Sequence, residues 1–149
     1  MSIPASPSAL LDVKRIEELM DARFPQIHSG GRKFVVEEVA LRSARVRMMA
    51  DPRNIRPGGT IAGPAMFTLA DFSIYVAVVA TLGEAGFEAV TSNLNIIFLA
   101  KPAATDMTAV VKLIRLGRRL AVGEAEIYSE GVTDMVAHAT ATYALPIMG

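Results

Sequence analysis

The residue that most needs a chemical explanation is Asp71, the one charged side chain in a long apolar run over 64–82. A carboxylate in an apolar setting has to be paired, hydrogen-bonded, protonated or open to a pocket. A glycine-rich segment, 57–63, leads into Pro64, which suits the first position of a helix. The first N–H groups of a helix lack internal partners and can stabilise an oxyanion. A carboxylate and free donors in one segment are the components of an acyl-transfer site, although a purely structural Asp bonded to a neighbouring strand gives the same pattern.

The apolar run predicts one helix that begins at Gly63 or Pro64 and continues to Leu82. Few of its residues are polar, so the helix is apolar around most of its circumference and belongs in a protein core. A membrane span is the competing interpretation, because about 20 apolar residues cross a bilayer. We disfavour it, since a charged residue at the centre of a span costs about 2.5–3.5 kcal/mol and no basic residues flank the run closely on both sides.

Length and composition predict one globular domain over 1–149. The chain has 149 residues, of which 52% are hydrophobic, and this is enough to bury a core. Its 15 basic and 15 acidic residues give no net charge, which does not favour nucleic acid or a membrane surface as a partner. The absence of cysteine excludes disulfides and thiolate sites, and the two histidines lie far apart, so we expect no metal and no cofactor. No secretory signal is visible, so we expect a cytoplasmic location.

The rest of the sequence predicts a tail, an amphipathic helix and a series of strands. Residues 1–8 form a loose tail, and a helix over 9–25, capped by Ser8 or Asp12, turns an apolar stripe to the domain or to a subunit contact. Strands are expected over 33–49 with a break near Ser43, and over 87–99, 107–116, 120–129 and 132–145. Consecutive strands with short links pair as antiparallel neighbours. One antiparallel sheet curled around the apolar helix therefore gives an α+β fold with its core over 33–146.

Two further groups of residues each allow two interpretations. Alternation along the strand that follows the helix places Asn93 and Asn95 on one side, together with Thr91. Asparagine is depleted from strands and costly to bury unpaired, so this side is either a solvated or interface surface or a polar wall beside a binding site. Arg118 and Arg119 belong to a predicted hairpin turn. They are either solvated or hold phosphate groups, which arginine binds in a bidentate manner.

Three motifs carry a resemblance to a known family. They are Pro57-Gly58-Gly59-Thr60-Ile61-Ala62-Gly63-Pro64, then Thr68-Leu69-Ala70-Asp71, then Val90-Thr91-Ser92-Asn93-Leu94-Asn95-Ile96-Ile97-Phe98. Over about 34–146 the sequence resembles the hotdog-fold acyl-CoA thioesterases of the phenylacetate-pathway type. The resemblance implies the hotdog fold and hydrolysis of a small or medium acyl-CoA, with coenzyme A as part of the substrate. It also implies a site between subunits, hence a homodimer at minimum or a homotetramer.

The resemblance assigns roles to individual residues. Asp71 would act as general base or nucleophile, the N–H of Gly63 would polarise the thioester carbonyl, and Thr91 would position the attacking water. The residues expected to bind substrate are Asn54, Arg56, Gly59, Thr60, Asn93, Asn95, Arg118 and Arg119.

The sequence departs from this family where the central helix begins. The family commonly has His-Gly-Gly where this chain has Ala62, Gly63 and Pro64, and Arg56 stands where an Asn is frequent, with Asn54 nearby. Pro64 also lacks the N–H that another residue would offer. These departures favour, as the alternative, an acyl-CoA or small-lipid binding protein without turnover. A hotdog dehydratase or hydratase is disfavoured, because those enzymes use a catalytic His near the start of the helix.

Overall fold

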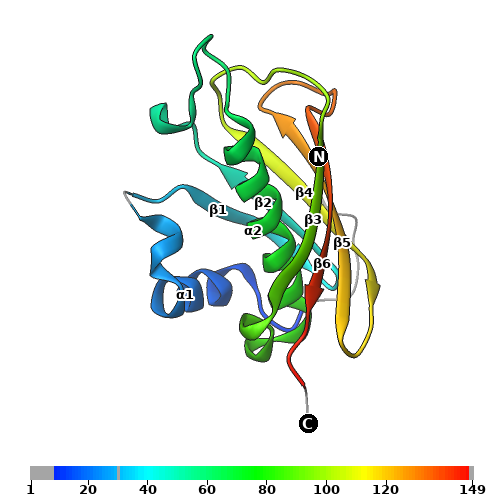
Figure 1. The fold of residues 1–149 in the computed structure, drawn as a ribbon. Coiled ribbons are helices and arrows are strands. Elements are labelled where there is room, and N and C mark those ends of the chain that lie inside the picture. The colour runs from blue at the N-terminus through cyan, green and yellow to red at the C-terminus, as the bar shows by residue number, and fades with distance from the viewer. Residues whose placement is uncertain (1–8, 30, 148–149) are drawn as a thin grey trace.

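A six-stranded antiparallel sheet curls around one long helix in the computed structural model of this protein, which describes residues 9–29 and 31–147 (Figure 1). The helix, α2, spans Gly63–Leu82. The strands lie in the spatial order β1-β2-β4-β5-β6-β3. Their bounds are Phe34–Ala40 (β1), Ser43–Met48 (β2), Val90–Phe98 (β3), Met107–Leu116 (β4), Leu120–Ser129 (β5) and Ala137–Ala144 (β6). The predicted α+β hotdog architecture is confirmed.

The helix α2 begins and ends where the sequence predicts. Ala62 precedes it in an extended conformation with ψ 145°, and Pro64 lies in its first turn. Gly83 ends it with φ 82°, in the left-handed region that favours glycine, and donates its N–H to the carbonyl of Val79. The helix is long and apolar enough to cross a membrane, but 72% of the qualifying stretch is buried inside the fold. As predicted, α2 is therefore the central helix of the core, and the sheet packs around it.

The strand order follows the sequence only in part. The prediction that consecutive strands pair is confirmed for β1 with β2, for β4 with β5 and for β5 with β6. It is wrong for β3, which pairs with β6, while β2 pairs with β4. Short turns force neighbours to pair, whereas β3 is separated from β2 by the whole of α2 and from β4 by the loop over 99–106. β3 therefore forms one edge of the sheet (Figure 1).

The N-terminal helix is shorter than the predicted span of 9–25. α1 covers Val13–Arg23, because the side chain of Asp12 caps it by accepting a 2.8 Å hydrogen bond from an N–H of its first turn. Its buried side chains pack onto the core beside α2 and β1. The predicted tail over 1–8 and the other proposed cap, Ser8, lie outside the described residues.

Two predicted strand boundaries are also wrong. β3 begins at Val90 and β6 at Ala137, three and five residues later than expected. A short 3-10 helix, Glu84–Glu88, occupies most of the stretch between α2 and β3. The break predicted near Ser43 is confirmed as the turn between β1 and β2.

The helix α2 packs very close to the sheet at Gly123 in β5. A Cβ atom at this position would lie 2.9 Å from Cγ2 of Ile74 and 3.1 Å from Cδ2 of Leu113. Both neighbours are buried core side chains with little room to move. The close approach of helix and sheet therefore requires a residue without a side chain here.

Candidate active site

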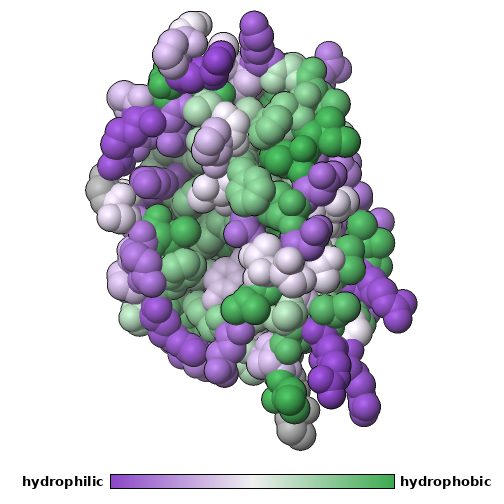
Figure 2. All heavy atoms as spheres, viewed as in Figure 1, coloured by the Kyte–Doolittle hydropathy of each residue, from purple (hydrophilic) through white to green (hydrophobic). Residues whose placement is uncertain are grey.

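One face of α2 is not covered by the sheet. The α2 residues that escape full burial are Gly63, Pro64, Phe67, Thr68, Asp71, Tyr75 and Leu82, and all but the last recur at helical spacing. Figure 2 views this face, which is hollowed between α1 and β3, with hydrophobic side chains gathered over the end of β3 and the loop that follows it. Asp71 therefore lies on the accessible side of a helix that is otherwise buried.

Two hydroxyl groups hold the carboxylate of Asp71. Thr91 in β3 donates a 2.7 Å hydrogen bond to Oδ1. The hydroxyl of Tyr143 in β6 lies 2.6 Å from the same oxygen and 2.8 Å from the backbone carbonyl oxygen of Asp71. Within the described residues, no group donates a hydrogen bond to Oδ2. Neighbouring strands do bind Asp71, as the structural interpretation requires, but they use one oxygen and leave the other free.

Tyr143 was not predicted as a site residue. It is only 3% exposed, and burial, followed by the charge of Asp71, raises the pKa of its phenol well above the ordinary value. The hydroxyl therefore stays protonated and can donate. Its ring stacks on that of Tyr75 with the centroids 6.0 Å apart. Alternation along β6 could have pointed to it, because that pattern turns Tyr143 toward the helix, and a buried tyrosine hydroxyl needs a partner.

Thr91 and the two asparagines lie on opposite faces of β3, contrary to the predicted alternation. The pairing with β6 shifts by one residue between Thr91 and Asn93, which is a β-bulge at Ser92. Thr91 opposes Tyr143 and faces the helix, whereas Asn93 and Asn95 oppose outward-facing threonines of β6. Both asparagines are exposed. Within one protomer they are therefore not a polar wall beside Asp71.

The start of α2 leaves a backbone donor free beside an apolar pocket. Among the described residues, the N–H of Gly63 makes no hydrogen bond, and Pro64 has no N–H. The ring of Phe98 covers this glycine, since a Cβ there would lie 3.2 Å from the ring. The pocket has a volume of about 460 Å³ and is lined by Gly63, Pro64, Phe67, Thr68, Ile96 and Phe98.

Four predicted substrate-binding residues form the loop in front of this helix. Asn54 accepts a 2.7 Å hydrogen bond at its backbone carbonyl from the N–H of the residue that caps α2. Arg56 donates its N–H to the carbonyl of Thr60 at 2.9 Å and accepts from the N–H of Gly59 at 3.0 Å. Gly59 has φ 82°, so the turn needs a glycine. These contacts position the start of the helix and involve no contact with Asp71.

Arg118 and Arg119 lie at the other end of the molecule from Gly63. They form the turn between β4 and β5, next to the end of α2 (Figure 1). Both are exposed and line a pocket of about 600 Å³ together with Leu82, Gly117, Leu120, Ala144, Leu145, Pro146 and Ile147. Because Leu82 follows Asp71 by eleven residues, this pocket lies about 16 Å further along the helix axis.

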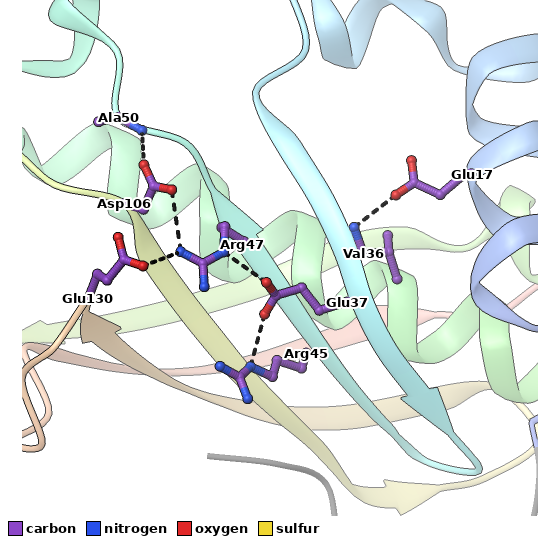
Figure 3. Close-up of polar contacts among 8 residues, drawn as sticks. All are labelled: Glu17, Val36, Glu37, Arg45, Arg47, Ala50, Asp106 and Glu130. Carbon is purple, nitrogen blue, oxygen red and sulfur yellow. Dashed lines mark hydrogen bonds and ion pairs between the residues drawn. The ribbon is translucent and has the colours of Figure 1, made fainter.

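A second charged cluster lies on the outer face of the sheet, and its charges compensate one another. Arg47 contacts Glu37, Asp106 and Glu130 at 2.8, 3.3 and 3.1 Å, and Arg45 contacts Glu37 at 3.0 Å (Figure 3). Such a network ties β1 and β2 to the residue just before β4 and the residue just after β5, and it leaves no unbalanced cation for a ligand. Across 9–29 and 31–147, no group of three or more His, Asp or Glu side chains could hold a metal ion.

Comparison with known proteins agrees with this geometry. Residues 58–136 match the family model of the Thioesterase superfamily. A candidate thioesterase from Silicibacter sp. TM1040 is 37% identical with a TM-score of 0.82, and the match covers 93% of this chain and 94% of that chain. No protein of curated function matches the sequence.

Two more distant structures share the fold. Zebrafish thioesterase superfamily member 2 is 19% identical with a TM-score of 0.79, over 91% of this chain and 99% of that chain. A variant of the phenylacetic acid degradation protein PaaI from Thermus thermophilus is 23% identical with a TM-score of 0.68, over 87% and 99%. The family match spans more than half of the chain and contains the free donor and the anchored carboxylate of α2. This chain therefore belongs to the thioesterase superfamily, and its matches support thioester hydrolysis as its general reaction.

Proposed function

We propose that this protein hydrolyses a small or medium acyl-CoA thioester to the free acid and coenzyme A, with Asp71 as general base or nucleophile. One observation carries the proposal: the carboxylate is anchored through Oδ1 while Oδ2 stays free on the accessible face of α2. A carboxylate held in one orientation loses less freedom on reaching the transition state. Thr91 already donates to Oδ1, so its oxygen can accept a hydrogen bond from a water beside Oδ2.

Both roles of Asp71 give a balanced reaction. As a base, Oδ2 takes a proton from water while the water oxygen bonds to the thioester carbonyl carbon, and the carbon–sulfur bond then breaks. As a nucleophile, Oδ2 bonds to that carbon and expels the thiolate, and water hydrolyses the resulting anhydride. In either case the thiolate of coenzyme A takes up a proton and the acid leaves as its carboxylate.

The proposed oxyanion donor, the N–H of Gly63, requires a second copy of the chain. Gly63 and Asp71 are eight residues apart on one helix, which is about 12 Å along its axis. An oxyanion donor has to lie within about 3 Å of the carbonyl oxygen, while the base acts at the carbon of the same group. We therefore infer that each site combines Asp71 of one protomer with Gly63 of another.

The edge strand β3 offers a surface for that assembly. Its outer edge has no partner strand within the described chain. Val90, Ile97 and Phe98 on this strand are 61%, 53% and 50% exposed. A long apolar edge strand pairs readily with another chain. Two β3 strands side by side would give the homodimer, and association of two dimers would give a homotetramer.

Coenzyme A carries its nucleotide phosphates at the far end of the pantetheine arm from the thioester. Exposed arginines some distance from Asp71, such as Arg118 and Arg119, suit those phosphates better than residues beside the carboxylate. In the proposed dimer, Asn54, Arg56, Gly59 and Thr60 of the second protomer accompany its Gly63 to the site. The loop would then contact the substrate near the thioester.

The second candidate is an acyl-CoA or small-lipid binding protein without turnover. The observation that favours it is that few hydrogen-bond donors are available to an oxyanion where α2 begins. The side chain of the capping residue, Ala62, makes no hydrogen bond, and Pro64 has no N–H. A single backbone donor gives an oxyanion less stabilisation than two.

One experiment separates the two candidates. Release of free thiol is measured with a panel of short, medium, aromatic and branched acyl-CoAs, for the wild type and for Asp71→Asn, and binding is measured by calorimetry. We expect the variant to lose turnover and to keep its affinity, because the amide has the shape of the carboxylate without its basicity. Turnover that survives in Asp71→Asn would exclude the role of Asp71. Binding without any wild-type turnover would establish the binding protein.

A further inference from the structure

A second cavity opens on the accessible face of α2, beyond Asp71 toward the end of the helix. It has a volume of about 300 Å³ and is lined by Arg23, Phe24, Tyr75, Phe87 and Ala89. These residues come from the end of α1, from α2 and from the segment that leads into β3. The cavity is therefore enclosed partly by the N-terminal helix.

Two residues that line the cavity are neighbours of residues in the proposed site. Tyr75 follows Asp71 by one helical turn and points to the same face of α2. Its ring stacks on Tyr143, whose hydroxyl contacts Asp71 at 2.6 Å. Ala89 lies two residues before Thr91, the other hydroxyl donor to Asp71. A group attached to a carbonyl carbon at Asp71 would therefore lie about one helical turn from a residue that lines this cavity.

The walls of the cavity are mostly aromatic. Phe24 and Phe87 both stand edge-on to Tyr75, at interplanar angles of 89° and 83°. The hydroxyl of Tyr75 donates a 2.7 Å hydrogen bond to the backbone carbonyl of Phe87, so it does not need a hydrogen-bond acceptor on a ligand. Burial raises the pKa of Tyr75 to about 12, so the phenol is neutral. The one charged group, on Arg23, lies over the ring of Phe87 at 4.7 Å.

We infer that this cavity receives the acyl group of the substrate and limits it to a compact, uncharged, apolar one. The inference rests on the proposed function, because it requires an acyl-CoA whose carbonyl lies at Asp71. A volume of about 300 Å³ is at the lower end of the range for ligand pockets, which favours a compact group over a long chain. Phe24, at the end of α1, forms the wall that stops the chain, so a helix outside the family-matched segment 58–136 sets the acyl length.

The pocket where α2 begins is the competing location for the acyl group. It is also apolar and lies against Gly63, but Phe98 on its wall belongs to the edge strand that the proposed dimer covers. Phe67 on its other wall is 42% exposed. Phe24 lines the first cavity and Phe67 the second, so truncating either residue enlarges one pocket and the two substitutions make a matched pair of variants.

The test measures kcat/KM for butanoyl-, hexanoyl-, octanoyl-, decanoyl- and dodecanoyl-CoA with the wild type, Phe24→Ala and Phe67→Ala. We expect wild-type kcat/KM to fall along the series. In Phe24→Ala the optimum should move to longer chains, with a gain of up to about fourfold for each methylene newly buried. Phe67→Ala should keep the wild-type order of preference. Phe24→Leu repeats the test with a smaller change if the alanine variant does not fold.

Binding gives a readout independent of turnover. In the Asp71→Asn background, calorimetry should show that Phe24→Ala tightens the binding of decanoyl-CoA and that Phe67→Ala does not. A shift caused by Phe67→Ala alone overturns the inference and places the acyl group where α2 begins. Normal turnover with no shift in either variant also overturns it and leaves the proposed function intact. If the wild type neither binds nor hydrolyses any acyl-CoA, the proposed function fails and this inference fails with it.

Discussion

Replacing Tyr143 by phenylalanine removes one hydroxyl group from Asp71 and leaves the aromatic ring in place. The hydroxyl lies 2.6 Å from Oδ1, and Thr91 holds the same oxygen at 2.7 Å. Because the ring is buried and stacked on Tyr75, the phenylalanine should keep its position. The variant therefore loses one anchor of the carboxylate with little change in packing.

The size of the effect follows from the kind of hydrogen bond that is lost. A hydrogen bond to a charged group contributes about 1.5–3 kcal/mol. If this contribution orients Oδ2 in the transition state, kcat should fall about tenfold to a hundredfold, since 1.36 kcal/mol is tenfold in rate. KM should stay the same, because the hydroxyl contacts Asp71 and not the substrate. Adding Thr91→Val should lower kcat by more than the product of the single effects, because no donor to Oδ1 then remains.

Tyr128→Phe is the matched control. The hydroxyl of Tyr128 donates a 2.6 Å hydrogen bond to Oε1 of Glu126 on the outer face of the sheet, so the same kind of contact is lost away from Asp71. Steady-state kinetics of thiol release should show wild-type kcat for this variant. A folded Tyr143→Phe with kcat within about twofold of the wild type, the spread of ordinary neutral substitutions, would refute the anchoring role. Equal losses in both variants would indicate a general effect of removing a tyrosine hydroxyl.

Two further predictions concern stability. Gly123→Ala should lower the free energy of unfolding by about 1–3 kcal/mol, because its Cβ would lie 2.9 Å from Cγ2 of Ile74. Urea denaturation measures this change. A variant as stable as the wild type would show instead that α2 can move away from β5. The free energy of unfolding should also fall as the pH rises from about 10 to about 12. Burial raises the pKa of Tyr75 from 10.0 to about 12, so the folded state holds the phenol proton more tightly than the unfolded chain does. Tyr75→Phe should make this fall shallower in urea titrations at several alkaline pH values, and an unchanged slope would contradict the assignment.

The central helix and its carboxylate could be predicted because their signals are local. Pro64 marks the first turn, and the apolar run up to Leu82 contains one charge, so helix, burial and Asp71 follow from adjacent residues. The Gly63 donor follows from the same stretch. The local pattern does not show which carboxylate oxygen of Asp71 accepts hydrogen bonds, because both donors come from strands that follow α2 in the sequence.

The position of those donors depends on long-range register. Tyr143 lies 72 residues from Asp71, on a strand that β3 joins out of sequence order. A one-residue change of register turns every side chain to the other face of a strand. The bulge in β3 makes that change between Thr91 and Asn93, so it brings the hydroxyl to Asp71 and sends both asparagines outward. A regular strand would turn Thr91, Asn93 and Asn95 to the same face. Because of the bulge, one face of β3 supplies the Thr91 hydroxyl to Asp71, while the other face carries the two exposed asparagines.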